Sequence, residues 1–98
     1  MPAYVIVDVE IHDHEIYAEY RQLTPAAIAA YGGRFVVRGG AVQPLEGDWK
    51  PERIVVLEFT TVEQARAWWD SPEYRPARDL RQRSASTRMI VVEGFGGF

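Results

Sequence analysis

Four short segments rich in β-branched residues constrain the fold of this chain more than any other feature. In the first, residues 4–11, Val5, Val7 and Val9 alternate with other side chains, as is typical of a strand. Residues 34–38, 53–59 and 87–93 have the same character. Apolar residues at helical spacing lie between the first and second segments and between the third and fourth. The predicted order is therefore β-α-β-β-α-β.

The first predicted helix covers residues 14–31. Asp13 is a suitable N-cap, and Gly32 and Gly33 mark the C-terminal end. Pro25 lies in the middle and removes a backbone donor, so we expect a kink or a restart there. The residues that recur at helical spacing on its inner face are Ile16, Tyr20, Leu23, Ala27 and Tyr31.

The second helical region begins after a threonine cap at position 60 or 61. A Ser-Pro step at residues 71–72 ends this helix, and a further helical piece is expected from Pro76 to about residue 85. The predicted inner stripe of the first piece consists of Val62, Ala65 and Trp69, with Trp68 beside them.

This order of elements predicts an α+β, ferredoxin-like sandwich, the split βαβ arrangement. Its antiparallel sheet has four strands in the order 4-1-3-2, and both helical regions cover one face of that sheet. A chain of 98 residues fits a single domain, here residues 1–98, with a small core.

The face of the sheet that the helices leave uncovered is the main functional indication. The alternation assigns Val5, Val7, Val9, Phe35, Val37, Val55, Leu57, Phe59, Ile90 and Val92 to the helix side. It leaves Tyr4, Ile6, Asp8, Arg34, Val36, Arg38, Ile54, Val56, Glu58, Met89, Val91 and Glu93 on the other side. Because a solvated sheet face is mostly polar, the apolar members of the second set indicate an interface or a ligand cavity. We therefore predict a homodimer in which two sheets face each other, a dimeric α+β barrel. Residues 94–98 are expected to form a flexible tail with two aromatic anchors, Phe95 and Phe98, that either packs on the partner subunit or frays.

Charged side chains lie among these apolar ones. Arg38 and Glu58 belong to adjacent predicted strands, and buried charges need a partner or a ligand. One interpretation is a structural ion pair. The other is a site in which Arg38 binds an anion and Glu58 acts as acid or base. Arg34 would share this space, and a mouth between sheet and helices would be lined by Trp68, Tyr31 and Tyr74.

Several classes of function are excluded or disfavoured. The chain has no cysteine, which excludes disulfides, thiolate zinc sites and iron–sulfur clusters. His12 and His14 flank a helix cap and point apart, so we predict neither a metal nor a cofactor. A net charge of −3 does not suit nucleic acid. A solvated helix face is expected for Arg75, Arg78, Arg81, Arg83 and Arg88. No apolar run reaches the about 20 residues of a membrane span, and no export signal is visible, so a cytoplasmic location is expected.

Six stretches carry a more specific pattern: residues 4–9, 31–40, 45–49, 56–59, 67–74 and 92–94. Together, over nearly the whole chain, they resemble the domain-of-unknown-function family numbered thirteen-thirty. The resemblance implies the dimeric α+β barrel superfamily, which includes cofactor-independent monooxygenases, isomerases and haem enzymes. The positions that match the family's motifs are Gly32, Gly33, Arg38, Gly39, Gly40, Glu46, Gly47, Glu58, Trp68, Ser71, Pro72, Tyr74 and Arg81.

Two functional hypotheses follow. The first is a homodimeric small-molecule-binding protein, or a cofactor-independent enzyme of monooxygenase or isomerase type, that takes a small, partly apolar anion. Its catalytic candidates are Arg38 and Glu58, and its ligand-binding candidates are Tyr31, Arg34, Trp68, Tyr74 and Arg81. The alternative is a non-catalytic binding or assembly module whose charges only fix the dimer. The sequence leaves open whether the protein is an enzyme.

Overall fold

The computed structural model describes residues 1–96. Its sheet has four antiparallel strands in the order β2-β3-β1-β4. This is the predicted order read from the opposite edge, so the ferredoxin-like topology is confirmed. The strands are β1 (Ala3–Ile11), β2 (Arg34–Arg38), β3 (Arg53–Phe59) and β4 (Ala85–Glu93). The last strand therefore begins two residues earlier than the β-branched pattern predicts.

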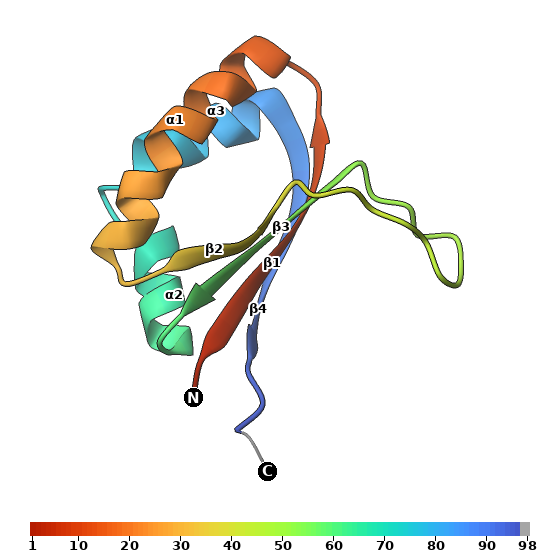
Figure 1. Ribbon diagram of the computed structural model, residues 1–98. Coiled ribbons are helices and arrows are strands. Elements are labelled where there is room, and N and C mark those ends of the chain that lie inside the picture. Colours follow the sequence, from red (N-terminus) through yellow and green to blue (C-terminus); the bar gives the residue numbers. More distant parts are fainter. Residues whose placement is uncertain (97–98) are drawn as a thin grey trace.

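The helices α1 (His14–Ala30), α2 (Val62–Trp69) and α3 (Arg75–Ser84) all lie on one face of this sheet, and the other face is uncovered (Figure 1). The loop between β2 and β3 extends from the uncovered side, away from the helices (Figure 1). Phe95 is 79% exposed, and Phe98 lies outside the described residues.

The predicted caps are present. Asp13 Oδ1 accepts a hydrogen bond from the amide of Ile16 at 3.1 Å, and Thr61 Oγ1 accepts one from the amide of Gln64 at 3.1 Å. Each bond satisfies one of the amides that the first turn of a helix leaves without a partner.

The expected restart at Pro25 is wrong, because α1 is continuous through this residue. Proline has no amide hydrogen, so the carbonyl four residues earlier, that of Arg21, loses its helical donor. Arg38 supplies the missing bond from β2, since its Nη2 donates to Arg21 O at 2.9 Å. A side chain from the sheet thereby completes the helix.

Two strands place their side chains differently from the alternation rule. In β2 a bulge between Phe35 and Val37 shifts the register, so Val37 pairs with Val56 on the open face. Arg38 consequently pairs with the core residue Val55 and turns toward the helices. The bulge reverses the predicted faces of Val37 and Arg38.

In β4 the predicted faces are also reversed. Val5 pairs with Val91 and Ile6 with Ile90, and paired residues share a face. Met89 and Val91 therefore pack against the core, whereas Ile90 is 61% exposed on the open face. Residues 89–92 are apolar at every position, so their sequence contains no contrast from which the inner face could be chosen.

The helices also differ in detail from their predicted stripes. Trp68 is 1% exposed and Trp69 is 40% exposed, so Trp68 is the inner tryptophan of α2. In α1, Leu23 is 49% exposed. The buried residues of that helix are Tyr17, Thr24, Ala27 and Ile28.

The close packing of Gly33 leads to a test of the fold. A Cβ atom here would lie 2.5 Å from Cε1 of Phe59 and 2.9 Å from Cγ2 of Ile28. We expect Gly33→Ala to lower the free energy of unfolding by about 1–3 kcal/mol, the usual effect of overpacking, as measured by urea denaturation. Gly40→Ala is the matched control, since a Cβ there meets nothing within 4 Å. Equal stabilities of the two variants would contradict this packing.

Candidate functional site

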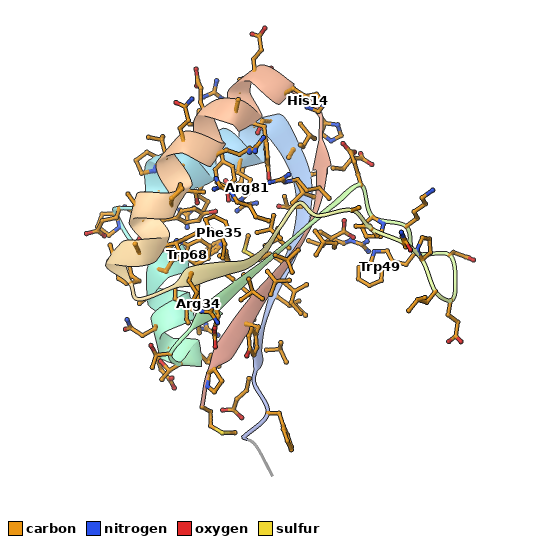
Figure 2. All side chains as sticks on the ribbon, in the orientation of Figure 1. His14, Arg34, Phe35, Trp49, Trp68 and Arg81 are labelled. Atoms are coloured by element: carbon orange, nitrogen blue, oxygen red, sulfur yellow. The ribbon has the colours of Figure 1, made fainter. Side chains whose placement is uncertain are left out.

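A buried polar cluster lies between the sheet and the helices, where Trp68, Tyr74 and Arg81 meet. These residues are 1%, 0% and 3% exposed. The rings of Trp68 and Tyr74 stack with centroids 4.2 Å apart, and Arg81 Nε donates to Tyr74 Oη at 3.2 Å. Trp68 and Arg81 lie in the space between the helices and the sheet in Figure 2. The structure thus brings together three of the five predicted ligand-binding residues.

The Ser-Pro step between α2 and α3 positions this cluster. Ser71 Oγ donates to the carbonyl of Trp68 at 2.7 Å and accepts from the amide of Tyr74 at 3.0 Å. Both bonds are buried, and together they fix the turn that joins the two helices. The tyrosine ring is consequently held against the tryptophan.

Arg81 is the unusual member, because its charge is permanent and its partners are neutral. Its guanidinium donates to the hydroxyls of Tyr74 and Thr87. Among residues 1–96 no carboxylate lies within 4.0 Å of it. Burial of a charge without a counter-charge is costly, and this cost is typical of a site that receives an anion.

Tyrosines extend the cluster toward α1. Tyr20 Oη lies 3.2 Å from Tyr74 Oη. Burial, chiefly, raises the pKa of Tyr20 far above its ordinary value, so this hydroxyl stays neutral and serves as a hydrogen-bond partner. Tyr20 therefore supplies no negative charge that would offset the charge of Arg81.

One donor of the buried cluster has no partner within residues 1–96. Nε1 of Trp68 is buried and has no hydrogen-bond partner in the described part of the chain. Buried donors of this kind are rare, and each one needs an explanation. The described residues therefore leave this indole donor open to an acceptor atom of a ligand.

Two hollows adjoin this cluster and share Trp68, Arg81 and Met89 as a common wall. The outer cleft, between α2, α3 and β4, has a volume of about 1010 Å³. The inner hollow, between α1 and the sheet, has about 20 Å³, enough for about one water molecule. Small-molecule sites usually measure about 300–1,000 Å³, so only the outer cleft has the size of a ligand site.

The expectation that Arg81 lies on a solvated helix face is wrong. Ala77, Arg81 and Ser84 are the buried residues of α3, and they follow one another at four- and three-residue steps. They therefore form one face of the helix. Two small residues at this spacing were the available signal that the arginine between them points inward.

Arg38 and Glu58 do not form the predicted pair. The bulge in β2 turns Arg38 to the helix side, whereas Glu58 lies on the open face beside Tyr4. Glu58 instead forms an ion pair with Arg34, Nη2 to Oε1, at 2.5 Å. The sheet separates the two residues, so a single chain does not bring them together.

The remaining candidates lie outside the buried cluster. Arg34 is on the open face in its pair with Glu58. Tyr31 is at the end of α1, and its hydroxyl donates to Glu73 Oε1 at 2.7 Å. This bond lowers the pKa of Glu73 and raises that of Tyr31. Neither Tyr31 nor Arg34 lines the outer cleft.

The open face carries an apolar belt, which we define as Val37, Val56, Ile6 and Ile90. Each of these residues is the cross-strand partner of the next, so the belt crosses all four strands. On one side of the belt lies the Arg34–Glu58 pair, and on the other Arg88 Nη2 contacts Asp8 Oδ2 at 2.6 Å. The predicted apolar face therefore exists, with Val37 added to it and with Ile90 and Val92 in place of Met89 and Val91.

In residues 1–96 no group of three or more histidine or carboxylate side chains is arranged to hold a metal ion. None of the helices in this part of the chain is long and apolar enough to cross a membrane.

Solved structures share this fold. The RPA0582 protein of Rhodopseudomonas palustris, described as of unknown function, has a TM-score of 0.79 at 21% identity over 96% of this chain and 82% of that chain. A dimeric ferredoxin-like protein from Jannaschia sp. CCS1 has a TM-score of 0.72 at 14% identity over 96% of this chain and 100% of that chain. SnoaB, a cofactor-independent oxygenase from Streptomyces nogalater, has a TM-score of 0.65 at 12% identity over 96% of this chain and 93% of that chain. These likenesses define a ferredoxin-like protein and extend to the fold alone.

The chain belongs to the family described as a domain of unknown function, DUF1330, which matches residues 2–95. This confirms the resemblance found in the sequence. No curated protein matches the chain.

The contact between Trp49 and Asp8 on the open face leads to a prediction about pH. Trp49 Nε1 donates to Asp8 Oδ2 at 3.0 Å, and this bond is the largest single cause of the lowered pKa of Asp8, to which the hydrogen bond and charge of Arg88 also contribute. A carboxyl group whose pKa is lower in the folded state stabilises the protein at any pH above its ordinary pKa. This stabilisation is lost as the pH falls through the pKa of the folded state. We expect Trp49→Phe to raise the pKa of Asp8 in a carboxyl NMR titration, with a stability deficit that shrinks in acid.

Leu45→Ala is the control for this titration. Leu45 belongs to the same loop and is fully exposed. An unchanged pKa of Asp8 in the Trp49 variant, or an equal rise in the Leu45 variant, would show that the indole bond is not the cause.

Proposed function

We propose that the protein is a homodimer that binds a small, partly apolar anion in the outer cleft, with Arg81 as the residue that holds the anionic group. The observation that carries this proposal is the 3% exposure of an arginine that has only neutral partners in residues 1–96. A guanidinium in such a place binds a carboxylate or another oxyanion through paired hydrogen bonds.

The walls of the outer cleft support a ligand that is apolar over most of its surface. Ala65, Ala85, Met89 and Val91 contribute apolar surface, and Trp68 also lines the cleft. The charged residues that line the cleft besides Arg81 are Glu63, Arg66 and Asp70. A few polar groups in a mostly apolar cleft are typical of small-molecule sites. The anionic end of the ligand would face Arg81, and its body would lie along β4 and α2.

The apolar belt supports the homodimer. Ile90 and Val37 are 61% and 37% exposed in the single chain, on a face that crosses four strands. A second copy of the same belt would remove this surface from water on both chains. The Jannaschia protein of the same fold is described as dimeric, which supports the same arrangement here.

Catalysis without a cofactor is an extension of this proposal. SnoaB has the same fold and is a cofactor-independent oxygenase. In an enzyme of this kind, Arg81 would stabilise negative charge on an oxygen atom of the bound substrate. The expected pairing of an anion-binding Arg38 with an acid or base Glu58 has no part in it, because the sheet of one chain separates these residues.

A second candidate function is an assembly module without a ligand. The two ion pairs that border the belt, Arg34–Glu58 and Arg88–Asp8, favour it, since charges at the edge of an interface fix register and orientation. In that case Arg81 would have no ligand, and only the dimer would depend on the open face.

The anion site is tested with thermal shift, using benzoate and octanoate as probes and neutral benzamide as the comparison compound. We expect a saturable rise in Tm with the anions, corresponding to about 2.7 kcal/mol when the ligand is at 100 times its Kd. Arg81→Met should abolish the rise. Arg83→Met, an exposed arginine of the same helix, should retain it. Circular dichroism checks that both variants fold.

Two outcomes would contradict the anion site. Arg81→Met could keep the response to the anions, or benzamide could act as strongly as benzoate. Compounds that raise Tm are the ones to assay for turnover under oxygen.

The dimer is tested by sedimentation of the wild type and of Ile90→Glu. A charge in the middle of the belt should convert the dimer to a folded monomer, because two unpaired carboxylates would be buried at the interface. Leu23→Glu is the matched control, since Leu23 is also large, apolar and exposed but lies on α1. A monomeric wild type, or a dimeric Ile90 variant, would refute the belt as the interface.

A further inference from the structure

Three arginines that the buried cluster does not use line the inner hollow from three different elements. Arg21 comes from α1, Arg38 from β2 and Arg53 from β3. Arg21 and Arg38 are exposed and Arg53 is half-buried, so they stand at the solvent end of this hollow. We refer to them as the arginine cluster.

The guanidinium groups of Arg38 and Arg53 are held in place. Arg38 lies over the ring of Phe35 at 4.3 Å, and its Nη2 is bound to the carbonyl of Arg21. Arg53 Nε donates to Tyr17 Oη at 3.2 Å. Gly39, with φ of 73°, lies so close to Arg53 that a Cβ would clash with its guanidinium. Orientation by stacking, hydrogen bonding and a glycine lowers the entropy that binding would otherwise cost.

The cluster has no counter-charge. Within residues 1–96 no carboxylate lies within 4.0 Å of any of its three arginines. The whole chain has 14 acidic and 11 basic residues, so a scarcity of acids does not explain this. Like charges gathered at one place repel each other, and a bound anion would offset that repulsion.

The structural role of Arg38 does not account for the cluster. The carbonyl freed by Pro25 takes one hydrogen bond, from Nη2. The Nη1 end of Arg38 and both terminal nitrogens of Arg53 form no hydrogen bond to the described residues. Arg21 contributes its carbonyl to the fold, and its side chain forms no ion pair within residues 1–96.

We propose that the arginine cluster is a second anion site, separate from the outer cleft, that binds a phosphate group. Three guanidinium groups suit a compact oxyanion with more than one charge, because each planar fork can donate two hydrogen bonds to its oxygens. The group could belong to free phosphate or to a phosphorylated small molecule, since both present the same oxygens. Phe35 and Tyr17 beside the cluster offer apolar surface to an organic phosphate.

The test is an NMR titration with inorganic phosphate and with phenyl phosphate at constant ionic strength, with chloride as the balancing ion. We expect saturable shifts of the arginine side-chain signals. Arg21→Met should weaken binding about ten-fold, the effect of losing one charge-assisted contact. This variant keeps every hydrogen bond of the fold that Arg21 supplies, because those use its backbone. Tighter binding of phenyl phosphate would assign the site to an organic ligand, and equal binding to the free oxyanion.

Two controls keep the result specific. Arg83→Met should bind phosphate like the wild type, and Arg81→Met should lose the response to benzoate while retaining that to phosphate. The proposal is overturned if phosphate binding is not saturable at constant ionic strength, or if Arg83→Met weakens it as much as Arg21→Met. It is also overturned if Arg81→Met removes both responses, since the two sites would then be one.

Discussion

The guanidinium of Arg81, buried between the sheet and the helices, is the interaction on which the arrangement of the site depends. It joins α3 to the turn before it through Tyr74 and to β4 through Thr87. Tyr74 in turn stacks on Trp68 of α2 and meets Tyr20 of α1. A single permanent charge therefore contacts or orders side chains from every helix. Because its partners are neutral, this network leaves positive potential inside a small core, next to a cleft of ligand size.

Pro25 has an effect well beyond α1. By removing one amide hydrogen it leaves the Arg21 carbonyl without its helical donor, and Arg38 provides the replacement from β2. This is possible only because the bulge in β2 turns Arg38 toward the helices. The bulge in β2 thus allows Arg38 to replace the hydrogen bond that Pro25 removes from α1. Together the bulge and Pro25 place Arg38 against the backbone of Arg21, and both arginines line the inner hollow.

Most of the fold could be predicted from the sequence, because element order and capping depend on local patterns. Asp13 and Thr61 act as caps where the pattern placed them, and β2 and β3 have the predicted bounds. The faces of β2 and β4 could not be predicted in the same way. A bulge adds one residue without a local signal, and β4 is apolar at both parities between Met89 and Val92. Cross-strand pairing decides both cases, and pairing is a property of the whole sheet.

The same limit explains which site residues were found. One short turn brings together Trp68, Tyr74 and Arg81. These residues are close in the sequence, so their contact does not depend on how strands pair. The pairing of Arg38 with Glu58 depended on the register of two strands, and one extra residue in β2 was enough to place them on opposite faces.

That one-residue shift also separates two groups of residues, the apolar ones and Arg38, that the alternation pattern assigns to a single surface. With Arg38 turned inward, the open face keeps an apolar belt bordered by internally neutralised ion pairs, Arg34–Glu58 and Arg88–Asp8. Such a face can be buried against a copy of itself without leaving a charge unpaired. Arg81 and the arginine cluster lie on the helix side with the inner hollow and most of the outer cleft, although Ile90 of the belt also lines that cleft. The sheet therefore acts as a partition, with the surface suited to association on one side and the groups suited to anions on the other.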